Sequence, residues 1–435
     1  MQRSRNGREV QTRYTPPPRP GRARQRAYCL GVTPQGEDME ELKELLRTAG
    51  VAVVGELVQH REKPHANLYL GSGKVEELKP ALAAADANLV AIDDELSPRQ
   101  ERNLEAALGM PVIDRTAVIL DIFAGHAHTA DGKLQVELAQ LEYNLARMRG
   151  LWTHLERLGG GIGTRGPGET QIETDRRLAR DRIAALRRRL DHVRSNRAVQ
   201  RAERERAHLP SVALAGYTNA GKSTLLNALT GASVGVRDRL FHTLDPTTRT
   251  LRLQGRTYLM TDTVGFIRKL PHQLVDAFAA TLEETRLADL LLHVVDASAP
   301  EEELVQMTRA VDDVLEEIGV GDTPRVLALN KADLLSEDRR RELSFRHPEA
   351  QLVSAVSGEG LEELGDLVTA EFERTLRDVE LLVPFSDGGT LSELHDVAGD
   401  LEREDTPEGV RVSARMPAVV AERFDRYAND GDGAA

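Results

Sequence analysis

Apolar residues along the chain fall into short continuous runs that alternate with stretches where they recur every three or four positions. Between residues 27 and 114 the runs are AYCLGV, VAVVGELV, NLYLG, NLVAID and PVID. The stretches between them include DMEELKELLRTAG and KVEELKPALAAADA. Strand-like runs separated by helix-period segments are typical of an α/β unit with a mostly parallel sheet. We therefore predict an amino-terminal α/β domain over residues 27–114.

The strand-like runs stop at residue 115 and return near residue 209. Two helical stretches, 131–157 and 171–206, flank a glycine-rich loop at 158–168. This arrangement predicts a long helical hairpin over 115–208. In each stretch an apolar stripe is predicted to be buried. The first stripe contains Leu134, Leu138, Leu141, Leu145 and Met148, and the second contains Ile172, Leu178, Ile183, Leu186, Leu190 and Val193.

The pattern over residues 209–376 predicts a doubly wound domain in which six strands alternate with five helices. Its helical segments include 273–287, 301–318 and 360–376, and TRTLRLQGRTYLMTD predicts a hairpin. A small α+β carboxy-terminal domain is predicted over 377–427, with strands at VELLVPF and VRVSARMP and a helix near 390–403. Residues 428–435 form a tail. The predicted fold class is therefore α/β with a helical hairpin and a small α+β domain.

Composition narrows the setting of the protein. A length of 435 residues allows about three domains, and a hydrophobic content of 40% supports packed cores. The single cysteine, Cys29, cannot form an internal disulfide. No apolar run has the length of a signal peptide core or of a membrane span. We therefore expect a cytoplasmic protein with no membrane span, and peripheral membrane association stays open.

The net charge of −13 is unevenly distributed and does not exclude a nucleic-acid partner. Residues 1–26 hold eight Arg and one Glu among Pro and Gly, which predicts a disordered basic arm. Residues 176–206 hold twelve Arg against four acidic residues, whereas 387–408 hold eight acidic residues and one Arg. The arginine-rich helix is compatible both with RNA binding and with an ordinary solvated helix face.

The strongest motif is GYTNAGKST, residues 216–224, which fits G-x-x-x-x-G-K-[ST] between a predicted strand and a predicted helix. Gly216 and Gly221 allow a tight turn whose backbone N–H groups surround the β-phosphate. Lys222 is expected to reach the β- and γ-phosphate oxygens, and the Ser223 hydroxyl to bind Mg²⁺. The sequence therefore predicts a nucleotide triphosphate site.

Guanine is indicated by NKAD, residues 330–333, at the end of the apolar run RVLALN. The Asp333 carboxylate can accept hydrogen bonds from N1–H and the 2-amino group of guanine, whereas adenine has no such pair of donors. The Lys331 stem can cover the base, and SAV, residues 354–356, can supply a backbone N–H to guanine O6. GTP and GDP are therefore the expected ligands.

Two further segments complete the predicted site. DTVG, residues 262–265, closes a predicted strand; Asp262 is expected to hold Mg²⁺ through water, and the Gly265 N–H to sense the γ-phosphate. The segment VGVRDRLFHTLDPTTRT offers three candidates for the switch threonine: Thr243, Thr247 and Thr248.

Taken together, these motifs resemble the G domain of the HflX family of translation-factor-class GTPases. The matching segments are the P-loop, FHTLDPTTR, DTVGFIRKLPHQLVDAFAATLEE, NKAD and SAV. Upstream, VIDRTAVILDIFAGHAHTADGKLQVELAQLEYNLARMRGLW and GGGIGTRGPGETQIETDRR resemble the amino-terminal part of that family. The resemblance covers nearly the whole chain, and GPGETQIETDRR is its most specific part.

The resemblance selects Thr243 as the Mg²⁺-binding threonine. It implies a GTPase in which Lys222, Thr243, Asp262 and Gly265 act in catalysis, with Ser223 and Thr243 as metal ligands. The expected nucleotide contacts are Gly216, Tyr217, Thr218, Asn219, Ala220, Gly221, Lys222, Ser223, Thr224, Phe241, His242, Thr243, Leu244, Asp245, Asp262, Thr263, Val264, Gly265, Asn330, Lys331, Ala332, Asp333, Ser354, Ala355 and Val356.

Phe266 follows Gly265, where many GTPases place a glutamine that orients the attacking water. An aromatic ring cannot position that water, so we expect slow intrinsic hydrolysis that a macromolecular partner accelerates. The family resemblance implies that this partner is the large ribosomal subunit and that the protein dissociates stalled ribosomes, with a monomer off the ribosome. The glycine-rich loop then faces ribosomal RNA; on composition alone it could equally be a flexible linker.

Two other function classes stay open. One is a GTPase acting in subunit assembly or RNA processing, and the other is a non-translational regulatory GTPase that switches a protein partner through its acidic tail domain.

Three minor motifs receive structural interpretations. GSGKVEEL, residues 71–78, lacks P-loop spacing and predicts a strand-to-helix turn, although nucleotide use by the amino-terminal domain stays open. His126 and His128 are predicted to face different sides of a helix and not to form a metal site. The carboxylates of residues 93–95 are predicted to cap the helix that begins near SPRQERNLE.

Overall fold

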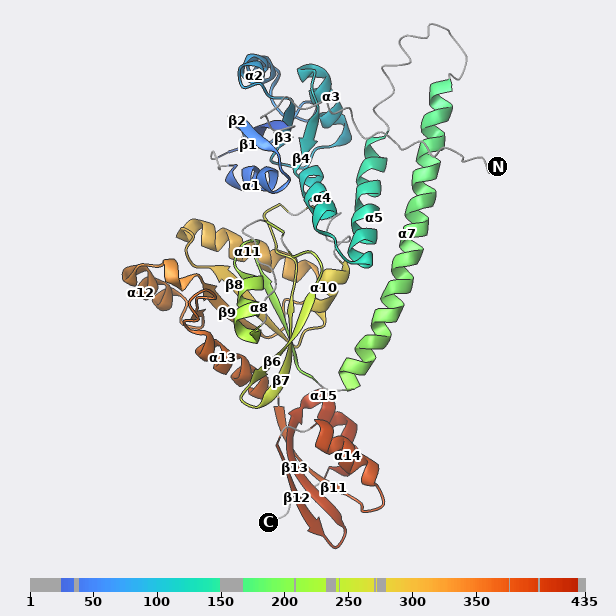
Figure 1. Ribbon diagram of the computed structural model, residues 1–435, viewed down its shortest axis with the longest axis vertical. Helices are drawn as coiled ribbons and strands as arrows, with labels where there is room; N and C mark the ends of the chain where they lie inside the picture. Colours follow the sequence, from blue (N-terminus) through green and yellow to red (C-terminus); the bar gives the residue numbers. More distant parts are fainter. Residues whose placement is uncertain are drawn as a thin grey trace, which may run out of the picture. The chain divides into compact units, whose positions relative to one another are not determined.

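The computed structural model describes residues 25–34, 39–148, 167–206, 209–231, 240–241, 243–269, 271, 279–374, 376–397 and 400–428 (Figure 1). Residues 1–24 of the predicted basic arm, most of the glycine-rich loop, His242 and the tail from residue 429 lie outside these ranges. The predicted arm is too long, because Arg26 already belongs to the first strand. Contacts divide the chain into two units: residues 1–125 with 140–181, and residues 126–139 with 182–435. The limits of these units, after residues 125, 139 and 181, all lie within the region 115–208 that is predicted as a helical hairpin.

The first unit contains a four-stranded parallel sheet in the order β2-β1-β3-β4. Its strands are β1 (Arg26–Thr33), β2 (Ala52–His60), β3 (Leu89–Ile92) and β4 (Val112–Asp114). The connecting helices are α1 (Glu40–Thr48), α2 (Ser72–Ala84) and α3 (Pro98–Leu108). Helices α2 and α3 share one apolar core with β1 and β3 through residues such as Leu78, Leu104 and Leu30. The predicted α/β organisation of this region is confirmed.

One of the predicted strands in this region is wrong. Residues 67–71 form no strand, and only an isolated bridge joins His65 and Tyr69. Tyr69 has a φ of 64° and is buried, and its hydroxyl donates to Asp94 Oδ2 at 2.5 Å and accepts from the Val32 N–H at 3.0 Å. Tyr69 is therefore buried, and its hydroxyl links Val32 near the end of β1 to Asp94, which follows β3.

Residues 71–78 do not form the predicted strand-to-helix turn, because α2 begins at Ser72 and the residues before it, 67–71, form no strand. The carboxylates of residues 93–95 do not cap α3. Ser97 does so through a capping box with Gln100, while Asp93 pairs with the buried Arg115 at 2.9 Å.

Three helices follow the first sheet: α4 (Arg115–His126), α5 (Ala130–Arg147) and α7 (Pro167–Arg206). The sequence missed α4, which is almost entirely apolar and resembles a buried strand in composition. His126 ends α4 and His128 lies in the connection to α5, so the two histidines do not share a helix.

The buried faces of the hairpin helices differ from prediction by about one position. The buried residues of α5 are Asp131, Gly132, Gln135, Val136, Ala139 and Tyr143, while Leu134, Leu138, Leu141 and Leu145 are half-buried. In α7 Ala179 replaces Leu178, which is 58% exposed, and Ile183, Leu186 and Leu190 are buried as predicted. In α5 the hydrogen bond from Tyr143 Oη to Asp114 turns the face that contains Tyr143 toward the first sheet.

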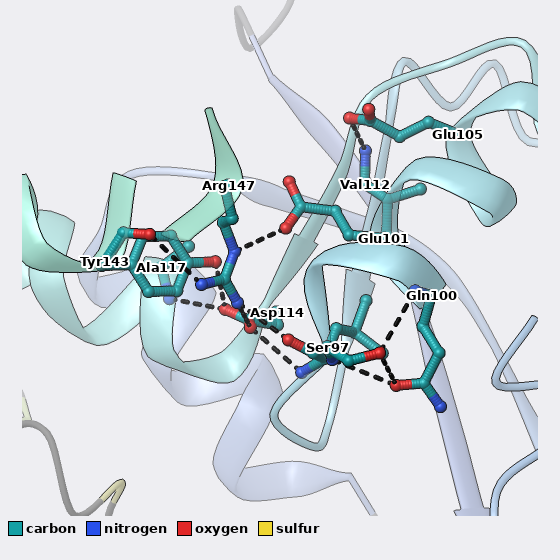
Figure 2. Close-up of polar contacts among 10 residues, drawn as sticks. Ser97, Gln100, Glu101, Glu105, Val112, Asp114, Ala117, Tyr143 and Arg147 are labelled. Carbon is teal, nitrogen blue, oxygen red and sulfur yellow. Dashed lines mark hydrogen bonds and ion pairs between the residues drawn. The ribbon is translucent and has the colours of Figure 1, made fainter. Parts of the chain in front are cut away.

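Tyr143 and Arg147 of α5 surround the carboxylate of Asp114, at the carboxyl end of β4 (Figure 2). Asp114 is fully buried and accepts from Tyr143 Oη at 2.7 Å, Arg147 Nη2 at 2.7 Å, the Ala117 N–H at 2.8 Å and the Leu96 N–H at 3.1 Å. Arg147 also pairs with Glu101 at 2.6 Å and lies over the Tyr143 ring. This network holds the end of α5 against the first sheet.

The second unit contains a six-stranded sheet in the order β10-β9-β8-β5-β7-β6, parallel except for β6. Its strands are β5 (Ser211–Gly216), β6 (Thr247–Leu253), β7 (Arg256–Asp262), β8 (Leu290–Asp296), β9 (Arg325–Asn330) and β10 (Gln351–Leu352). Its helices are α8 (Lys222–Thr230), α10 (Ala279–Arg286), α11 (Glu301–Glu317), α12 (Glu337–Arg346) and α13 (Leu361–Arg374).

Helices cover both faces of this sheet. Leu225 of α8 and Val368 of α13 belong to one apolar core, and Leu304 of α11 and Leu343 of α12 belong to another. This doubly wound arrangement is the predicted one, and it brings the loops after β5, β7, β9 and β10 to one edge of the sheet.

The chain continues into a three-stranded antiparallel sheet in the order β11-β13-β12, formed by β11 (Leu376–Val383), β12 (Asp400–Thr406) and β13 (Gly409–Pro417). Helices α14 (Gly388–Val397) and α15 (Ala418–Ala421) and the 3₁₀ helix η2 (Glu422–Tyr427) accompany it. The predicted helix over 390–403 is therefore too long, because residues 400–406 pair with β13. No helix in the described ranges is both long enough and apolar enough to cross a membrane.

Candidate functional site

The loop between β5 and α8 forms the expected P-loop turn. Gly221 has a φ of 93°, and a Cβ atom at this position would overlap the side-chain amide of Asn330. Asn219 also has a positive φ, of 62°. The turn therefore uses left-handed backbone on both sides of the buried Ala220. The turn ends at the amino-terminal end of α8, where free helix N–H groups and the helix dipole favour an anion.

Lys222 is the first residue of α8 and is 6% exposed. Its Nζ donates to the carbonyl oxygens of Gly216 at 2.9 Å and Tyr217 at 2.8 Å. Burial lowers the pKa of Lys222 to about 8, and the nearby Asp262 carboxylate partly opposes this effect. The ammonium group therefore lies at the P-loop, where an anionic phosphate would favour its charged form.

Three oxygen-bearing side chains converge at the amino-terminal end of α8. Ser223 Oγ donates to Asp262 Oδ2 at 2.6 Å and lies 2.8 Å from Thr243 Oγ1. Asp262 Oδ1 is buried and has no hydrogen-bond partner, and burial raises the pKa of this carboxyl group. A cluster of hydroxyl and carboxylate oxygens with one unused buried oxygen suits a hard divalent cation such as Mg²⁺. Ser223 and Thr243 would hold the ion, with Asp262 behind them, and the ion would neutralise phosphate charge.

The structure places one of the three candidate threonines at this cluster. Thr243 lies beside Ser223. Thr247 and Thr248 belong to β6, and the Thr248 hydroxyl bonds instead with that of Thr261 at 2.9 Å. The position of Thr243 is the one that the family resemblance implies.

Residues 263–266 lie directly against the P-loop. A Cβ atom on Gly265 would come within 2.7 Å of Thr218 Cγ2 and 3.1 Å of Lys222 Nζ. The Thr218 N–H donates to the Phe266 carbonyl at 2.7 Å, and the Phe266 N–H donates to the Gly216 carbonyl at 3.1 Å. Phe266 is 1% exposed. Its ring is therefore buried at the position after Gly265 and presents no polar group to orient a water molecule.

The NKAD and SAV segments meet at the ends of β9 and β10. Asn330 Nδ2 donates to the Ala220 carbonyl at 2.9 Å, and Asn330 Oδ1 accepts from the Ala355 N–H at 3.1 Å. Ser354 Oγ donates to Asp333 Oδ1 at 2.6 Å. Asn330 therefore joins the P-loop to both base-recognition segments, and Ser354 orients Asp333. Val356 is 81% exposed and lies at the outer end of this group.

Sequence reasoning missed two residues that support these segments. Asp296, at the end of β8, pairs with Lys331 Nζ at 2.6 Å. Arg340 of α12 donates to the Ala332 carbonyl at 2.6 Å and pairs with Glu359. Asp296 has a detectable signal, because it ends an apolar strand; Arg340 has none, since it is one of three consecutive arginines on an exposed helix.

The segment from Phe241 to Asp245 contacts both the end of the P-loop, at Ser223, and the residues before α5, at His128 and Thr129. Phe241 and Leu244 are buried, and Thr243 faces Ser223. The Asp245 carboxylate accepts from the backbone N–H groups of His128 at 3.0 Å and Thr129 at 2.9 Å. The structure therefore brings Asp245, predicted as a nucleotide contact, to the start of α5.

Known proteins that are similar to this chain are GTPases, in agreement with the nucleotide site. Three family models cover the chain: GTP-binding GTPase N-terminal over residues 36–124, GTP-binding GTPase Middle Region over 126–204, and 50S ribosome-binding GTPase over 211–331. A GTPase HflX from Lacrimispora saccharolytica is 46% identical over 91% of this chain and 92% of its own length. The chain belongs to the GTPase HflX family. It is a GTP-hydrolysing enzyme, as the assembled P-loop and NKAD segments require.

Other HflX relatives give the same result. The Escherichia coli GTPase HflX is 45% identical over 88% of this chain and 90% of its own length. Among solved structures, a GTP-binding protein from Sulfolobus solfataricus in complex with GDP is 26% identical over 80% of this chain and 98% of its own, with a TM-score of 0.41.

Proposed function

We propose that this GTPase binds the large ribosomal subunit in its Mg²⁺–GTP form and dissociates stalled ribosomes in the cytoplasm, as a monomer off the ribosome. The observation that carries the proposal is the solvent-facing arginine surface of α7. Arg177, Arg180, Arg187, Arg188 and Arg189 are all exposed, on a helix of 40 residues. Arginines in this setting bind phosphates without reading a base sequence, as recognition of folded RNA requires.

The catalytic site supports a partner-dependent reaction. Phe266 is buried beside the P-loop, and its ring carries no hydrogen-bonding group that could orient the attacking water. Hydrolysis then needs a group from outside the chain, in the way that other GTPases receive one from an activating partner. The family model named for 50S ribosome binding covers this same region.

Sedimentation of ribosomes tests the proposal. Whole ribosomes are incubated with the protein and a non-hydrolysable GTP analogue, and we expect separation into subunits and co-sedimentation with the large one. A Lys222→Ala variant should lose the nucleotide dependence. Preference for precursor particles over mature subunits would instead indicate a role in assembly, and binding to neither would indicate a non-translational regulator.

Charge reversal on α7 tests the RNA-facing surface. Arg187→Glu together with Arg188→Glu should weaken subunit binding and flatten its dependence on salt, because fewer counterions are released. Arg341→Glu on α12 is the matched control, since Arg341 is also exposed but lies outside α7. Equal binding by both variants would refute the assignment of α7 as the RNA contact.

A further inference from the structure

Asp245 forms a dense set of contacts with His128 and Thr129, the two residues directly before α5 and more than one hundred positions earlier in the chain. Its Oδ2 accepts from the His128 and Thr129 N–H groups at 3.0 and 2.9 Å, and its Oδ1 accepts from the Thr129 hydroxyl. The second unit contains all of these residues. A carboxylate that receives two backbone N–H groups at the start of a helix is stabilised by hydrogen bonds and by the helix dipole.

Thr129 links this carboxylate to the helix itself. Its hydroxyl donates to Asp245 and accepts from the Gly132 N–H at 3.0 Å, so it caps α5 while it binds Asp245. Gly132 lies so close that a Cβ atom there would overlap Asp245 Oδ1. The contact therefore depends on a small residue in the first turn of α5.

The neighbours of Asp245 connect this contact to the phosphate end of the site. Two residues earlier, Thr243 Oγ1 lies 2.8 Å from Ser223 Oγ. Between them, Leu244 is 4% exposed and packs into the interior. Three consecutive residues are thus held in place: Thr243 by Ser223, Leu244 by burial, and Asp245 by His128 and Thr129. Such a segment loses little further conformational freedom when Thr243 binds its target.

We propose that Asp245 is a positioning residue: by binding His128 and Thr129 at the start of α5, it holds the segment around Thr243 in the arrangement that binds Mg²⁺ and the γ-phosphate. The proposal rests on the GTPase assignment and does not depend on the ribosome. GDP has no γ-phosphate, so its binding relies on the P-loop and on Asn330 and Asp333. Loss of the Asp245 contact should therefore change the affinity for GTP and leave the affinity for GDP unchanged.

The experiment compares nucleotide affinities of the full-length protein in the absence of ribosomes. Asp245→Ala should weaken binding of a non-hydrolysable GTP analogue by about tenfold and raise the Mg²⁺ concentration that this binding needs, with GDP affinity unchanged. Asp245→Asn keeps an oxygen acceptor for the backbone N–H groups and should recover part of the loss.

Variants on the other side of the contact give an independent test. Thr129→Val removes the hydroxyl that joins Asp245 to Gly132 and should reproduce part of the effect of Asp245→Ala. The double variant should be no worse than Asp245→Ala alone, because both changes remove one shared interaction. Ser97→Ala is the matched control, since it removes the cap of α3 without touching the site.

Two results would overturn the proposal. One is an unchanged affinity of Asp245→Ala for the GTP analogue. The other is an equal loss for the GTP analogue and GDP, which would show that Asp245 supports the fold of the site in general. Neither result depends on ribosome binding, so the two proposals fail separately.

Discussion

The Ser354 hydroxyl donates a 2.6 Å hydrogen bond to Oδ1 of Asp333, and so fixes the carboxylate that the NKAD segment presents. Ser354 is fully buried at the end of the strand that carries SAV. Base selection in this protein therefore depends on two segments acting together: Asp333 supplies the acceptors, and Ser354 determines their orientation.

Asp333→Asn should weaken GTP binding and favour xanthosine triphosphate, because the new amide can donate to the 2-oxo group of xanthine. The preference for guanine over xanthine, measured by competition, should reverse by several powers of ten in equilibrium constant. Asp338→Asn is the matched control, since Asp338 is fully solvent-exposed on α12. Retained guanine preference in Asp333→Asn would contradict the role of this carboxylate.

Nucleotide binding should take up a proton near pH 8. Burial lowers the pKa of Lys222 to about 8, and the added phosphate charge raises it again, so a deprotonated lysine gains a proton on binding. Calorimetry of GDP binding in two buffers of different ionisation enthalpy should show about half a proton taken up at pH 8 and far less at pH 7. Equal uptake at both pH values would argue against this pKa.

The lowered pKa of Lys222 also predicts how the free energy of unfolding depends on pH. Because the pKa of Lys222 is lower in the folded protein than the ordinary 10.5, the unfolded chain binds more protons between pH 8 and 10.5. The contribution of Lys222 to the free energy of unfolding should therefore rise through that window and stay constant below pH 8. Urea unfolding of the second unit at pH 7.5 and 9.5, compared between the protein and Lys222→Met, measures this contribution.

Gly265→Ala should reduce the rate of GTP hydrolysis by at least a hundredfold. The new methyl group would lie 2.8 Å from the Thr218 backbone, so residue 265 must move away from the phosphate position. Single-turnover hydrolysis is the measurement. Gly73→Ala is the control, because a Cβ atom at Gly73 meets no atom within 4 Å. Normal turnover in Gly265→Ala would show that this backbone position is not critical.

Asp114→Ala should destabilise the first unit by about 3–5 kcal/mol, because it removes one of the two buried carboxylates that pair with Arg147 and leaves the buried Tyr143 hydroxyl without its acceptor. Tyr143→Phe should cost about 1–2 kcal/mol, since it removes one hydrogen bond to the same carboxylate. Hydrogen exchange of β4 amides reports these losses for this unit alone. Glu76→Ala is the control, because Glu76 of α2 pairs with Lys79 at the surface and its loss should cost under about 1 kcal/mol.

The parts of the fold that the sequence predicts are those where local pattern and tertiary packing agree. The strand that ends at Gly216, the helix that begins at Lys222 and the hairpin between Thr247 and Asp262 all follow this rule. The strand at Asp400–Thr406 does not, because five of its seven residues are charged. It forms because β13 supplies its hydrogen-bond partners, which no local pattern reveals.

The candidate site shows the same division. Lys222, Ser223, Asp262 and Asp333 belong to motifs whose spacing encodes their chemistry. Asp245 is different, because no spacing in the sequence links it to its partners His128 and Thr129. A pairing across 116 positions can be found only once the chain is folded.

The contact between Asp245 and Thr129 also determines how this protein can be divided. A fragment that begins at residue 209 contains every nucleotide motif but lacks residues 126–139, which belong to the same unit as the GTPase sheet. Such a fragment would lack His128 and Thr129, the residues that bind Asp245 next to Thr243. Altered GTP hydrolysis after amino-terminal truncation would therefore report the loss of α5 as much as the removal of a regulatory domain. A GTPase unit that keeps residues 126–139 is discontinuous in sequence. Joining residue 139 to residue 182 by a short linker would produce it.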